Sequence, residues 1–386
     1  MKSHFGEVAP RDPTTALPTY PAKFSCRVRT QEMAVSEEEP RCNSRFWIDL
    51  CIIVALAALL RVAFSPGMFA SDDLTYFSRA LEIARGIWSS SDYIGAIRYG
   101  VNIPVGASIA LFGPSLLAGY LVPLLCSLCE IGTVAIIVRP AWGERAALYA
   151  AILLCFMPLH IELATMIHAD PMLALAITLT FAWFWLGENS NNRWLFFAAG
   201  VSAGLAYWIK EASVLFLATF LVYSVAARRW RLSWAYAGAG ALLLFVLNCG
   251  LMWALSGDPL HVVMVTRSMV DTTWTDKTAA DGPLFYLRYL FLDVRHTWLA
   301  AYLALTGGIY LLVQRRVTAT DQRRFGAYVT IWLFGLLAAF SFIPVSFVPL
   351  RFVMKQSNYM TIFLAPLAIM ARSACPKWGD GCEPGS

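Results

Sequence analysis

Residues 71–86 read SDDLTYFSRALEIARG and follow directly on the first long apolar segment, which ends near Phe64. Two adjacent carboxylates, Asp72 and Asp73, therefore stand just beyond a hydrophobic segment. The residues after them have the spacing of an amphipathic helix, and Gly86 is its expected end. The stretch predicts a short helix that lies on a membrane surface with an acidic pair at its start.

The two faces of this predicted helix differ in polarity. Leu74, Phe77 and Ala80 fall on the apolar face, whereas Arg79 and Glu82 fall on the polar face. The partial positive charge at a helix N-terminus favours the ionised form of carboxylates at its start. An ionised carboxylate at a membrane surface suits a general base or a metal ligand. The ordinary alternative is a solvated helix whose aspartate serves as a cap.

The composition of the whole chain is that of a membrane protein. Of its 386 residues, 58% are hydrophobic and 14% are charged, whereas about a quarter of the residues in soluble domains are charged. An apolar excess over this length predicts several membrane-crossing helices. The net charge of +5 does not indicate a nucleic-acid partner, because the basic residues gather in short turns between apolar segments.

Ten apolar segments predict an all-α membrane protein with about ten transmembrane helices and an amphipathic juxtamembrane helix in the first outer loop. We expect residues 1–45 to be a disordered cytoplasmic leader, 46–371 the transmembrane domain and 372–386 a short cytoplasmic tail. The segments are about 46–64, 115–138, 146–157, 172–186, 194–208, 212–226, 234–255, 298–313, 325–343 and one that ends near 371.

Two charged residues lie within these apolar segments. Arg61 is near the end of the first segment, and Glu130 is inside the second. An acid within a membrane normally faces the interior of the bundle or a partner group. A structural polar contact and a functional one are both open for Glu130.

The short basic turns fall on the cytoplasmic side if the N-terminus is cytoplasmic. On that topology the acidic stretch shares one outer face with His168, Asp170, Lys210, Arg351 and Lys355. Any one of these groups could be ordinary loop solvation. Their common side favours one shared site.

The cations on this face suit a lipid phosphate. Lys210, Arg351 and Lys355 are the candidates for a donor phosphate, and Arg267 and Arg288 lie on the same side. The other components of such a site are also present. An ionised aspartate suits deprotonation of an acceptor hydroxyl.

A divalent metal ion is a further expectation for this face. Asp73, His168 and Asp170 supply oxygen and nitrogen ligands that could hold such an ion near a leaving phosphate. Base, phosphate clamp and metal together describe the transfer of a sugar from a polyprenyl-phosphate donor. The partners expected are that donor, membrane lipids, and a glycan, lipid or protein acceptor.

Several short motifs carry a family resemblance. The chain resembles the GT-C superfamily of polytopic glycosyltransferases, of the protein O-mannosyltransferase and aminoarabinose-transferase type. Those families have Asp-Glu-x-x-Tyr in the first outer loop and Gly-Leu-Ala-x-x-x-Lys further on. The similar stretches here are Asp72-Asp73-Leu74-Thr75-Tyr76, Asn102-Ile103-Pro104, Gly204-Leu205-Ala206-Tyr207-Trp208-Ile209-Lys210, and Lys355 through Pro366.

The resemblance implies roles for individual residues. Asp72 would be the catalytic base, with Asp73 beside it in place of the family's glutamate. Asp170 would be a second acid that orients the acceptor or binds a metal. Lys210 and Lys355 would contact the donor phosphate. The resemblance also implies a multi-pass protein of the bacterial inner (plasma) membrane.

His168 departs from the family pattern. It is either a metal ligand or a polar residue that caps the following helix. Two other functions also remain open for the chain: a lipid or glycan transporter or flippase, and a non-catalytic subunit of a glycan assembly complex. Transporters place charges near the bilayer midplane and often have internal repeats, and the sequence shows no such repeat.

Overall fold

The computed structural model describes residues 44–68, 72–228, 230–272, 282–313, 320–348 and 350–373. Nearly all of the predicted leader (1–45) and of the predicted tail (372–386) lies outside these described residues. Both domain boundaries therefore stay predictions.

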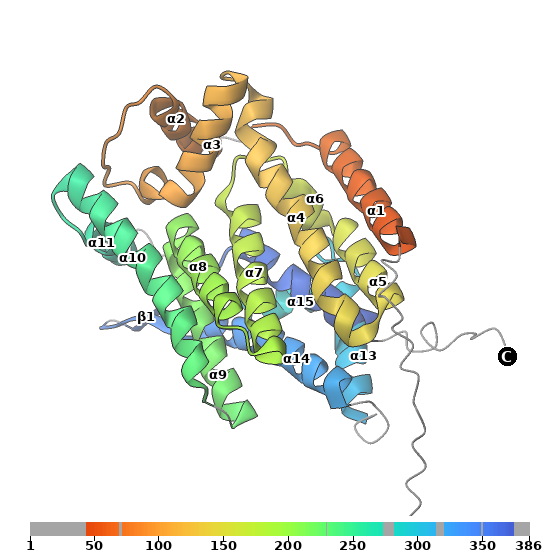
Figure 1. Ribbon diagram of the computed structural model, residues 1–386. Helices are drawn as coiled ribbons and strands as arrows, with labels where there is room; N and C mark the ends of the chain where they lie inside the picture. The colour runs from red at the N-terminus through yellow and green to blue at the C-terminus, as the bar shows by residue number, and fades with distance from the viewer. Residues whose placement is uncertain are drawn as a thin grey trace, which may run out of the picture. The chain divides into compact units, whose positions relative to one another are not determined.

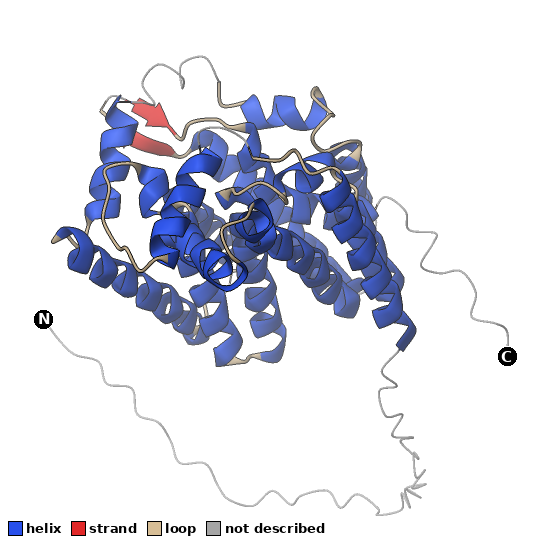
Figure 2. Ribbon diagram, turned by 90° about the horizontal axis from the view of Figure 1, so that it is seen from above, coloured by secondary structure: helices blue, strands red, loops and turns tan. Residues whose placement is uncertain are grey.

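The described chain is almost entirely helical, with one small antiparallel hairpin (Figures 1 and 2). The α-helices are α1 (Ser44–Ala63), α2 (Asp72–Ala84), α3 (Tyr99–Phe112), α4 (Leu116–Trp142), α5 (Glu144–Cys155), α6 (Pro158–Leu163), α7 (Ala169–Ser190), α8 (Arg193–Ile209), α9 (Leu217–Ala227), α10 (Ala235–Ser256), α11 (His261–Thr272), α12 (Phe285–Phe291), α13 (Ala300–Val313), α14 (Thr320–Phe342) and α15 (Thr361–Arg372).

Short elements connect these helices. The 3₁₀ turns are η1 (Ile94–Ile97), η2 (Glu211–Phe216), η3 (Leu232–Trp234) and η5 (Ser357–Met360), and the hairpin strands are β1 (Pro344–Phe347) and β2 (Leu350–Phe352). Phe347 pairs with Leu350 at the closed end of the hairpin.

Helix α7 lies in the middle of the bundle, between α4 and α8 (Figure 1). Its sequence is apolar on all sides, which is the pattern of a helix that other helices surround. About 78% of its most apolar stretch is buried. Asp170 lies in its first turn and Glu188 in its last, so this one helix joins the two ends of the bundle.

Helices α1 and α10 pack on the outside and expose large apolar side chains. Ile52 and Leu59 on α1, and Leu242 and Val246 on α10, are each more than half exposed. A soluble protein rarely leaves such apolar surface in water. Lipid is the solvent that suits these faces, so the chain is an integral membrane protein.

Five of the described helices are long and apolar enough to cross a membrane: α1, α4, α7, α14, and η3 together with α10 (Leu232–Ser256). Three shorter apolar helices span Tyr99–Phe112, Glu211–Ala227 and Ala300–Leu311. Every one of the ten predicted segments contains a helix. The all-α membrane fold is therefore confirmed, whereas the number of ten crossings is not.

The predicted amphipathic helix is α2, and it ends as expected. Gly86 has a positive φ of 78°, and its N–H donates to the carbonyl of Ile83. Its packed face differs from the expectation, because Arg79 is buried and Leu74 is exposed. The guanidinium of Arg79 donates to the carbonyl of Ala96 at 3.1 Å, so the loop after α2 covers the face that was expected to meet water.

Two close helix contacts depend on glycine. A Cβ on Gly100 would lie 2.6 Å from the backbone nitrogen of Ile209, which means that α3 packs directly on the end of α8. A Cβ on Gly200 would lie 1.9 Å from the carbonyl oxygen of Ala237, and one on Gly240 2.4 Å from that of Phe197. Small residues let membrane helices approach in this way, and here they join α10 to α8.

Candidate functional site

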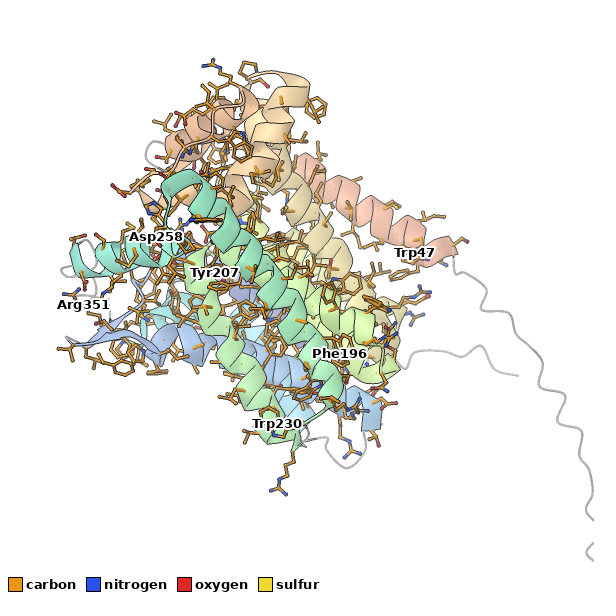
Figure 3. The ribbon with its side chains drawn as sticks, turned by 60° about the vertical axis from the view of Figure 1, so that its left-hand side comes forward. Trp47, Phe196, Tyr207, Trp230, Asp258 and Arg351 are labelled. Carbon is orange, nitrogen blue, oxygen red and sulfur yellow. The ribbon has the colours of Figure 1, made fainter. Side chains whose placement is uncertain are left out.

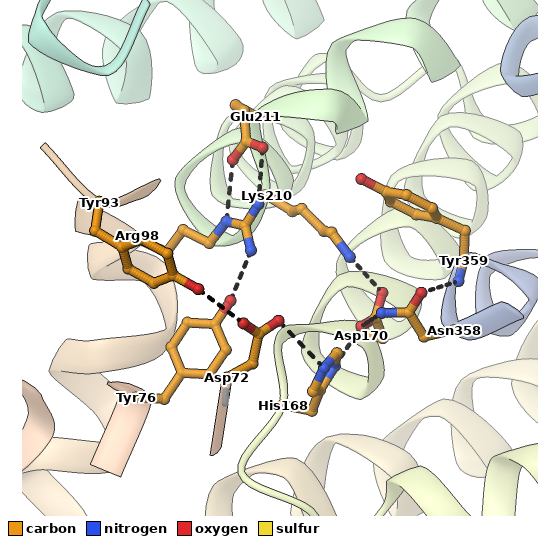
Figure 4. Close-up of polar contacts among 10 residues, drawn as sticks. All are labelled: Asp72, Tyr76, Tyr93, Arg98, His168, Asp170, Lys210, Glu211, Asn358 and Tyr359. Atoms are coloured by element: carbon orange, nitrogen blue, oxygen red, sulfur yellow. Dashed lines mark hydrogen bonds and ion pairs between the residues drawn. The ribbon is translucent and has the colours of Figure 1, made fainter. Parts of the chain in front are cut away.

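Asp72 is the first residue of α2, and its side chain is 41% exposed. The hydroxyl of Tyr93 donates to one of its carboxylate oxygens at 3.1 Å. The Nε2 atom of His168 lies 3.7 Å from the other oxygen. Figure 4 shows Asp72 between these two partners. The acid is thus held in place while part of it stays accessible to a substrate.

His168 and Asp170 stand where the chain enters α7. His168 has extended backbone angles (φ −126°, ψ 149°), and its side chain makes no capping hydrogen bond. The capping alternative for His168 is therefore not what the structure shows. Its Nδ1 atom lies against the carboxylate of Asp170. The partial positive charge at the start of α7 favours a carboxylate at that position.

Asp170 is fully buried and forms a buried ion pair with Lys210. The Nζ atom of Lys210 donates to Oδ1 at 2.9 Å, and the amide of Asn358 donates to Oδ2 at 3.0 Å. The ammonium also lies 3.9 Å from the ring centroid of Tyr359, a cation–π distance. Helix α7, the end of α8 and the turn η5 therefore meet at one carboxylate.

A second buried ion pair lies beside the first (Figure 4). Arg98 donates from Nε and Nη2 to the two oxygens of Glu211, at 3.0 and 2.8 Å. Its Nη1 atom donates to the hydroxyl of Tyr76 at 2.7 Å. The ring of Tyr76 in turn meets the ring of His168 edge to face. Tyr76 therefore connects the Arg98–Glu211 pair to the histidine beside Asp170.

The surroundings of Tyr76 and Arg98 fix the protonation of these two side chains. Burial raises the pKa of Tyr76, although the charge of Arg98 acts in the opposite direction. Burial alone would lower the pKa of Arg98, but Glu211 and Tyr76 more than offset this and hold that pKa well above its usual value. Tyr76 is therefore a neutral hydroxyl and Arg98 a permanent cation.

A cavity of about 640 Å³ adjoins Glu211. Its walls are mostly apolar, with Arg267 and Asp271 as further charged groups. Tyr207, which Figure 3 labels on α8, also lines it. The remaining lining residues are Ala212, Val214, Leu215, Phe245, Val263, Thr266, Val270, Val345, Ser346, Val348 and Val353. A largely apolar cavity with a few charged groups is the usual form of a ligand site.

The structure brings Asp72, His168, Asp170 and Lys210 together, as the sequence suggested. Asp73 lies on the buried face of α2 and is 1% exposed. The catalytic role predicted for it stays a prediction.

The two later cations contact other groups. Arg351 (labelled in Figure 3) donates to the carbonyl of Val270 and to the carboxylate of Asp271. Lys355 is buried and donates to the carbonyls of Phe340 and Ser341 in the last turn of α14. A cation at a helix C-terminus is a stabilising arrangement. The contact with a donor phosphate that we expected for Arg351 and Lys355 stays a prediction.

The proposed metal ligands Asp73, His168 and Asp170 do not form a metal-binding group. Within the described part of the chain, no three His, Cys, Asp or Glu side chains are arranged to hold a metal ion. Both oxygens of Asp170 already face hydrogen-bond donors, one of which is the ammonium of Lys210. This donor set does not fit a divalent cation.

Sequence reasoning did not assign a role to Tyr93, Arg98, Asn358 or the side chain of Glu211. Arg98 and Glu211 are 113 positions apart in the chain, and neither residue has a neighbour in sequence that indicates its partner. The only signal available was that Glu211 follows Lys210 on the same predicted face.

The fold defines a class of protein. The structure resembles that of ArnT from Cupriavidus metallidurans in the apo state with a TM-score of 0.67 and 19% identity, over 86% of this chain and 60% of ArnT. ArnT bound to undecaprenyl phosphate matches with a TM-score of 0.65, again at 19% identity, over 86% of this chain and 59% of ArnT. The chain is therefore a membrane protein with the GT-C fold, and it spans about three fifths of the length of these relatives.

A narrower family match lies within this class. Residues 104–253 match the family model of the dolichyl-phosphate-mannose-protein mannosyltransferases. The matched part contains His168, Asp170, Lys210 and Glu211, whereas Asp72 precedes it.

More distant structures share the fold. The archaeal oligosaccharyltransferase AglB from Archaeoglobus fulgidus, in complex with an inhibitory peptide and a dolichol-phosphate, matches with a TM-score of 0.58 and 14% identity, over 86% of this chain and 50% of AglB. None of the curated proteins matches the chain by sequence.

Proposed function

We propose that this protein is a membrane glycosyltransferase that moves a sugar from a polyprenyl-phosphate-linked donor to an acceptor hydroxyl. The observation that carries the proposal is the state of Asp72. Its carboxylate is part exposed and is held by Tyr93 and His168, beside the buried Asp170–Lys210 pair. A base must reach its substrate, and Asp72 is the acid in this cluster that is open to one.

The reaction proposed is a direct displacement. Asp72 takes the proton of the acceptor hydroxyl while the acceptor oxygen forms a bond to the anomeric carbon of the sugar. The bond between that carbon and the phosphate oxygen breaks, and the electron pair leaves with the polyprenyl phosphate. The products are the glycosylated acceptor and the free lipid phosphate. Holding base and donor in one geometry lowers the barrier to such a step.

The cavity next to Glu211 supports the lipid side of the proposal. Its apolar walls on α8, α10 and α11 suit an isoprenoid chain, and Arg267 at its wall suits the phosphate. Two relatives of the same fold bind such lipids, ArnT with undecaprenyl phosphate and AglB with a dolichol-phosphate. We call Asp72, Tyr93, His168, Asp170 and Lys210 the Asp72 cluster. Arg98 bonds to Glu211 at this cavity and to Tyr76, whose ring lies against His168 of the cluster.

Other cations remain part of the proposal. Lys210, Arg351 and Lys355 are candidates for contact with the leaving phosphate, in addition to the contacts that hold them now. Negative charge grows on the bridging oxygen as the bond breaks. A fixed cation nearby stabilises that charge without having to reorganise.

We place the reaction on the outer, periplasmic or lumenal, face of the membrane, with the N-terminus in the cytoplasm and the bacterial inner membrane as the location. The short basic turns support this orientation. The acceptor is a glycan, a lipid or a protein with a free hydroxyl. No step of the proposed reaction runs through a metal ion.

The direct test uses purified protein in detergent with a polyprenyl-phosphate sugar, and it measures the release of polyprenyl phosphate. We expect release that depends on an acceptor and that falls about 10³-fold in Asp72→Asn. Full turnover in both Asp72→Asn and Asp170→Asn would contradict the proposed site. In vesicles that contain the protein, movement of the lipid-linked sugar across the membrane without release of polyprenyl phosphate would favour the transporter. Binding of the lipid-linked sugar with neither movement nor release would favour the non-catalytic subunit.

A further inference from the structure

Five polar side chains meet inside the bundle, and the proposed reaction does not use them. They come from α1, α4, α6 and α7, and each is at most 3% exposed. We call them the interior network: Arg61, Ser127, Glu130, His160 and Thr178. Charged groups are expensive to bury inside a membrane protein, so such a cluster needs an explanation.

The interior network is a continuous chain of hydrogen bonds. Arg61 donates from Nε to the hydroxyl of Ser127 at 2.7 Å and from Nη2 to Nδ1 of His160. The Nε2 atom of His160 lies 3.0 Å from one oxygen of Glu130. Thr178 donates to the other oxygen at 2.9 Å. Each carboxylate oxygen therefore has its own partner.

The direction of these bonds fixes the state of His160. A guanidinium has donors only, so the Nδ1 atom that faces Arg61 must accept. The proton of a neutral imidazole is then on Nε2, where it is donated to Glu130. The positive charge of Arg61 and the negative charge of Glu130 balance across one neutral ring, and no net charge is buried.

Three of the four helices that supply the network, α1, α6 and α7, also lead to the candidate site. The chain passes from the last turn of α1, which holds Arg61, into the loop before Asp72. It passes from α6, which holds His160, directly to His168. Thr178 and Asp170 are on α7, eight residues apart, which corresponds to about 12 Å along a helix.

Helix α6 depends on such an anchor. It has six residues (Pro158–Leu163), and a helix of that length is not stable by itself. The residues 164–168 that follow have few backbone bonds, among them Met166 N–H to the carbonyl of Leu163 and His168 N–H to that of Met166. His160 is thus one of the contacts that hold α6 in front of His168, beside the hydrogen bond from the N–H of Leu159 to the carbonyl of His296.

We propose that the interior network is a positioning device, in which Arg61, His160 and Glu130 set the place of His168 relative to Asp72 and Asp170. In this role the three residues act through His168 and do not touch the substrate. The effect on catalysis rests on the proposed function, whereas the effect on the 164–168 segment does not.

The test removes both charges at once. The variant Arg61→Met with Glu130→Gln replaces both charged groups with neutral ones and leaves no unbalanced charge, so we expect it to fold with a melting temperature near that of the parent protein. Hydrogen exchange followed by mass spectrometry should show peptides that cover 164–168 exchanging at least tenfold faster. Turnover should fall at least tenfold, with the KM for the lipid-linked sugar unchanged within twofold.

A matched control neutralises a part-exposed ion pair, Arg139 with Glu144, whose side chains are about one third exposed. Arg139→Gln with Glu144→Gln should leave both exchange and turnover unchanged. Thr178→Val is the milder test if the double variant fails to fold, because it removes one donor to Glu130. It should raise the exchange of 164–168 about threefold.

Parent-like exchange at 164–168 in the folded double variant, or in Thr178→Val if only that variant folds, would overturn the inference. Full turnover in the double variant, at a melting temperature near that of the parent protein, would overturn the inference as well. A network that only stabilises the fold would give that result. If the parent protein shows no sugar transfer, the proposed function fails, and the exchange measurement still decides the inference.

Discussion

The Asp72 cluster and the interior network are built from the same kinds of side chain and differ in access. Both contain a histidine between two charged groups. In the network every member is buried, and both oxygens of Glu130 have partners. In the cluster the Asp72 side chain is 41% exposed, and His168 stands 3.7 Å from it. A closed network holds position, whereas a cluster with one open carboxylate can act on a substrate.

Because of this difference, similar substitutions should affect activity in one region and stability in the other. Loss of charge in the open cluster should remove activity and leave stability intact, because water can solvate what remains. Loss of one charge in the closed network should remove stability, because the partner charge is left buried without compensation. Each prediction below tests one side of this contrast.

The largest effect is expected from Asp72→Asn. The amide has the shape of the acid but does not accept a proton, so turnover should fall by about 10³-fold, within the range for a general base. The melting temperature in detergent should be unchanged. Asp92→Asn, which changes an exposed acid in the loop after α2, is the control and should retain full turnover. A loss of stability in Asp72→Asn would mean that the cluster is structural.

Glu130→Gln should show the opposite behaviour. It leaves Arg61 buried without its counter-charge, and we expect a loss of about 3–5 kcal/mol in the free energy of unfolding. Thermal unfolding in detergent measures this loss. Glu162→Gln on the exposed side of α6 is the matched control. An unchanged melting temperature for Glu130→Gln would contradict a closed, charge-balanced network.

Lys210→Met lies between the two cases, because Asp170 is buried but keeps its contacts with Asn358 and His168. We expect a loss of about 2 kcal/mol in stability, the cost of a buried charge that is only partly satisfied. Adding Asp170→Asn should recover most of that loss without recovering turnover. If the double variant regains turnover as well, the pair has no part in the reaction.

Tyr93→Phe should have a smaller effect. It removes one hydrogen bond to Asp72, worth about 1 kcal/mol, so turnover should fall about fivefold. Burial, with Asp72 beside it, raises the pKa of Tyr93, and the hydroxyl therefore stays a neutral donor at any pH below about 10. The ratio of the turnover of the parent protein to that of Tyr93→Phe should accordingly be constant from about pH 6 to pH 9. A ratio that falls towards one within that range would show that Tyr93 loses its proton there.

The smallest effect is expected from chelation. Because the oxygens of Asp170 face Lys210 and Asn358, removal of divalent cations should change turnover by no more than about twofold. The assay compares protein dialysed against a chelator with protein resupplied with magnesium or manganese. Loss of turnover that a metal ion restores would return the metal to the mechanism.

The sequence was informative where local pattern decides structure. The apolar segments identified the helices, and the spacing after Asp72 identified α2 with its end at Gly86. The shared side of His168, Asp170 and Lys210 anticipated their contact. These results depend on periodicity and on topology, which a single sequence records.

The sequence was uninformative where a partner is distant in the chain. Nothing near Arg98 indicates Glu211, and nothing near Glu130 indicates His160. Arg79 was expected in water, yet a later loop covers it. Lys355 was expected to contact a phosphate, yet the end of α14 lies within its reach. Such pairings arise only when the helices have packed.

The glycine contact between α8 and α10 has a consequence for biogenesis. Helix α10 is buried over only about 17% of its apolar stretch, so it has to pack against α8 as the bundle assembles. Close backbone contact at Gly200 and Gly240 supports that packing. Tyr207 and Phe245, which line the cavity with ring centroids 5.8 Å apart, belong to these two helices. The cavity that would receive a lipid is lined by both helices together with η2, α11 and β1, so it forms only when these elements have packed against one another.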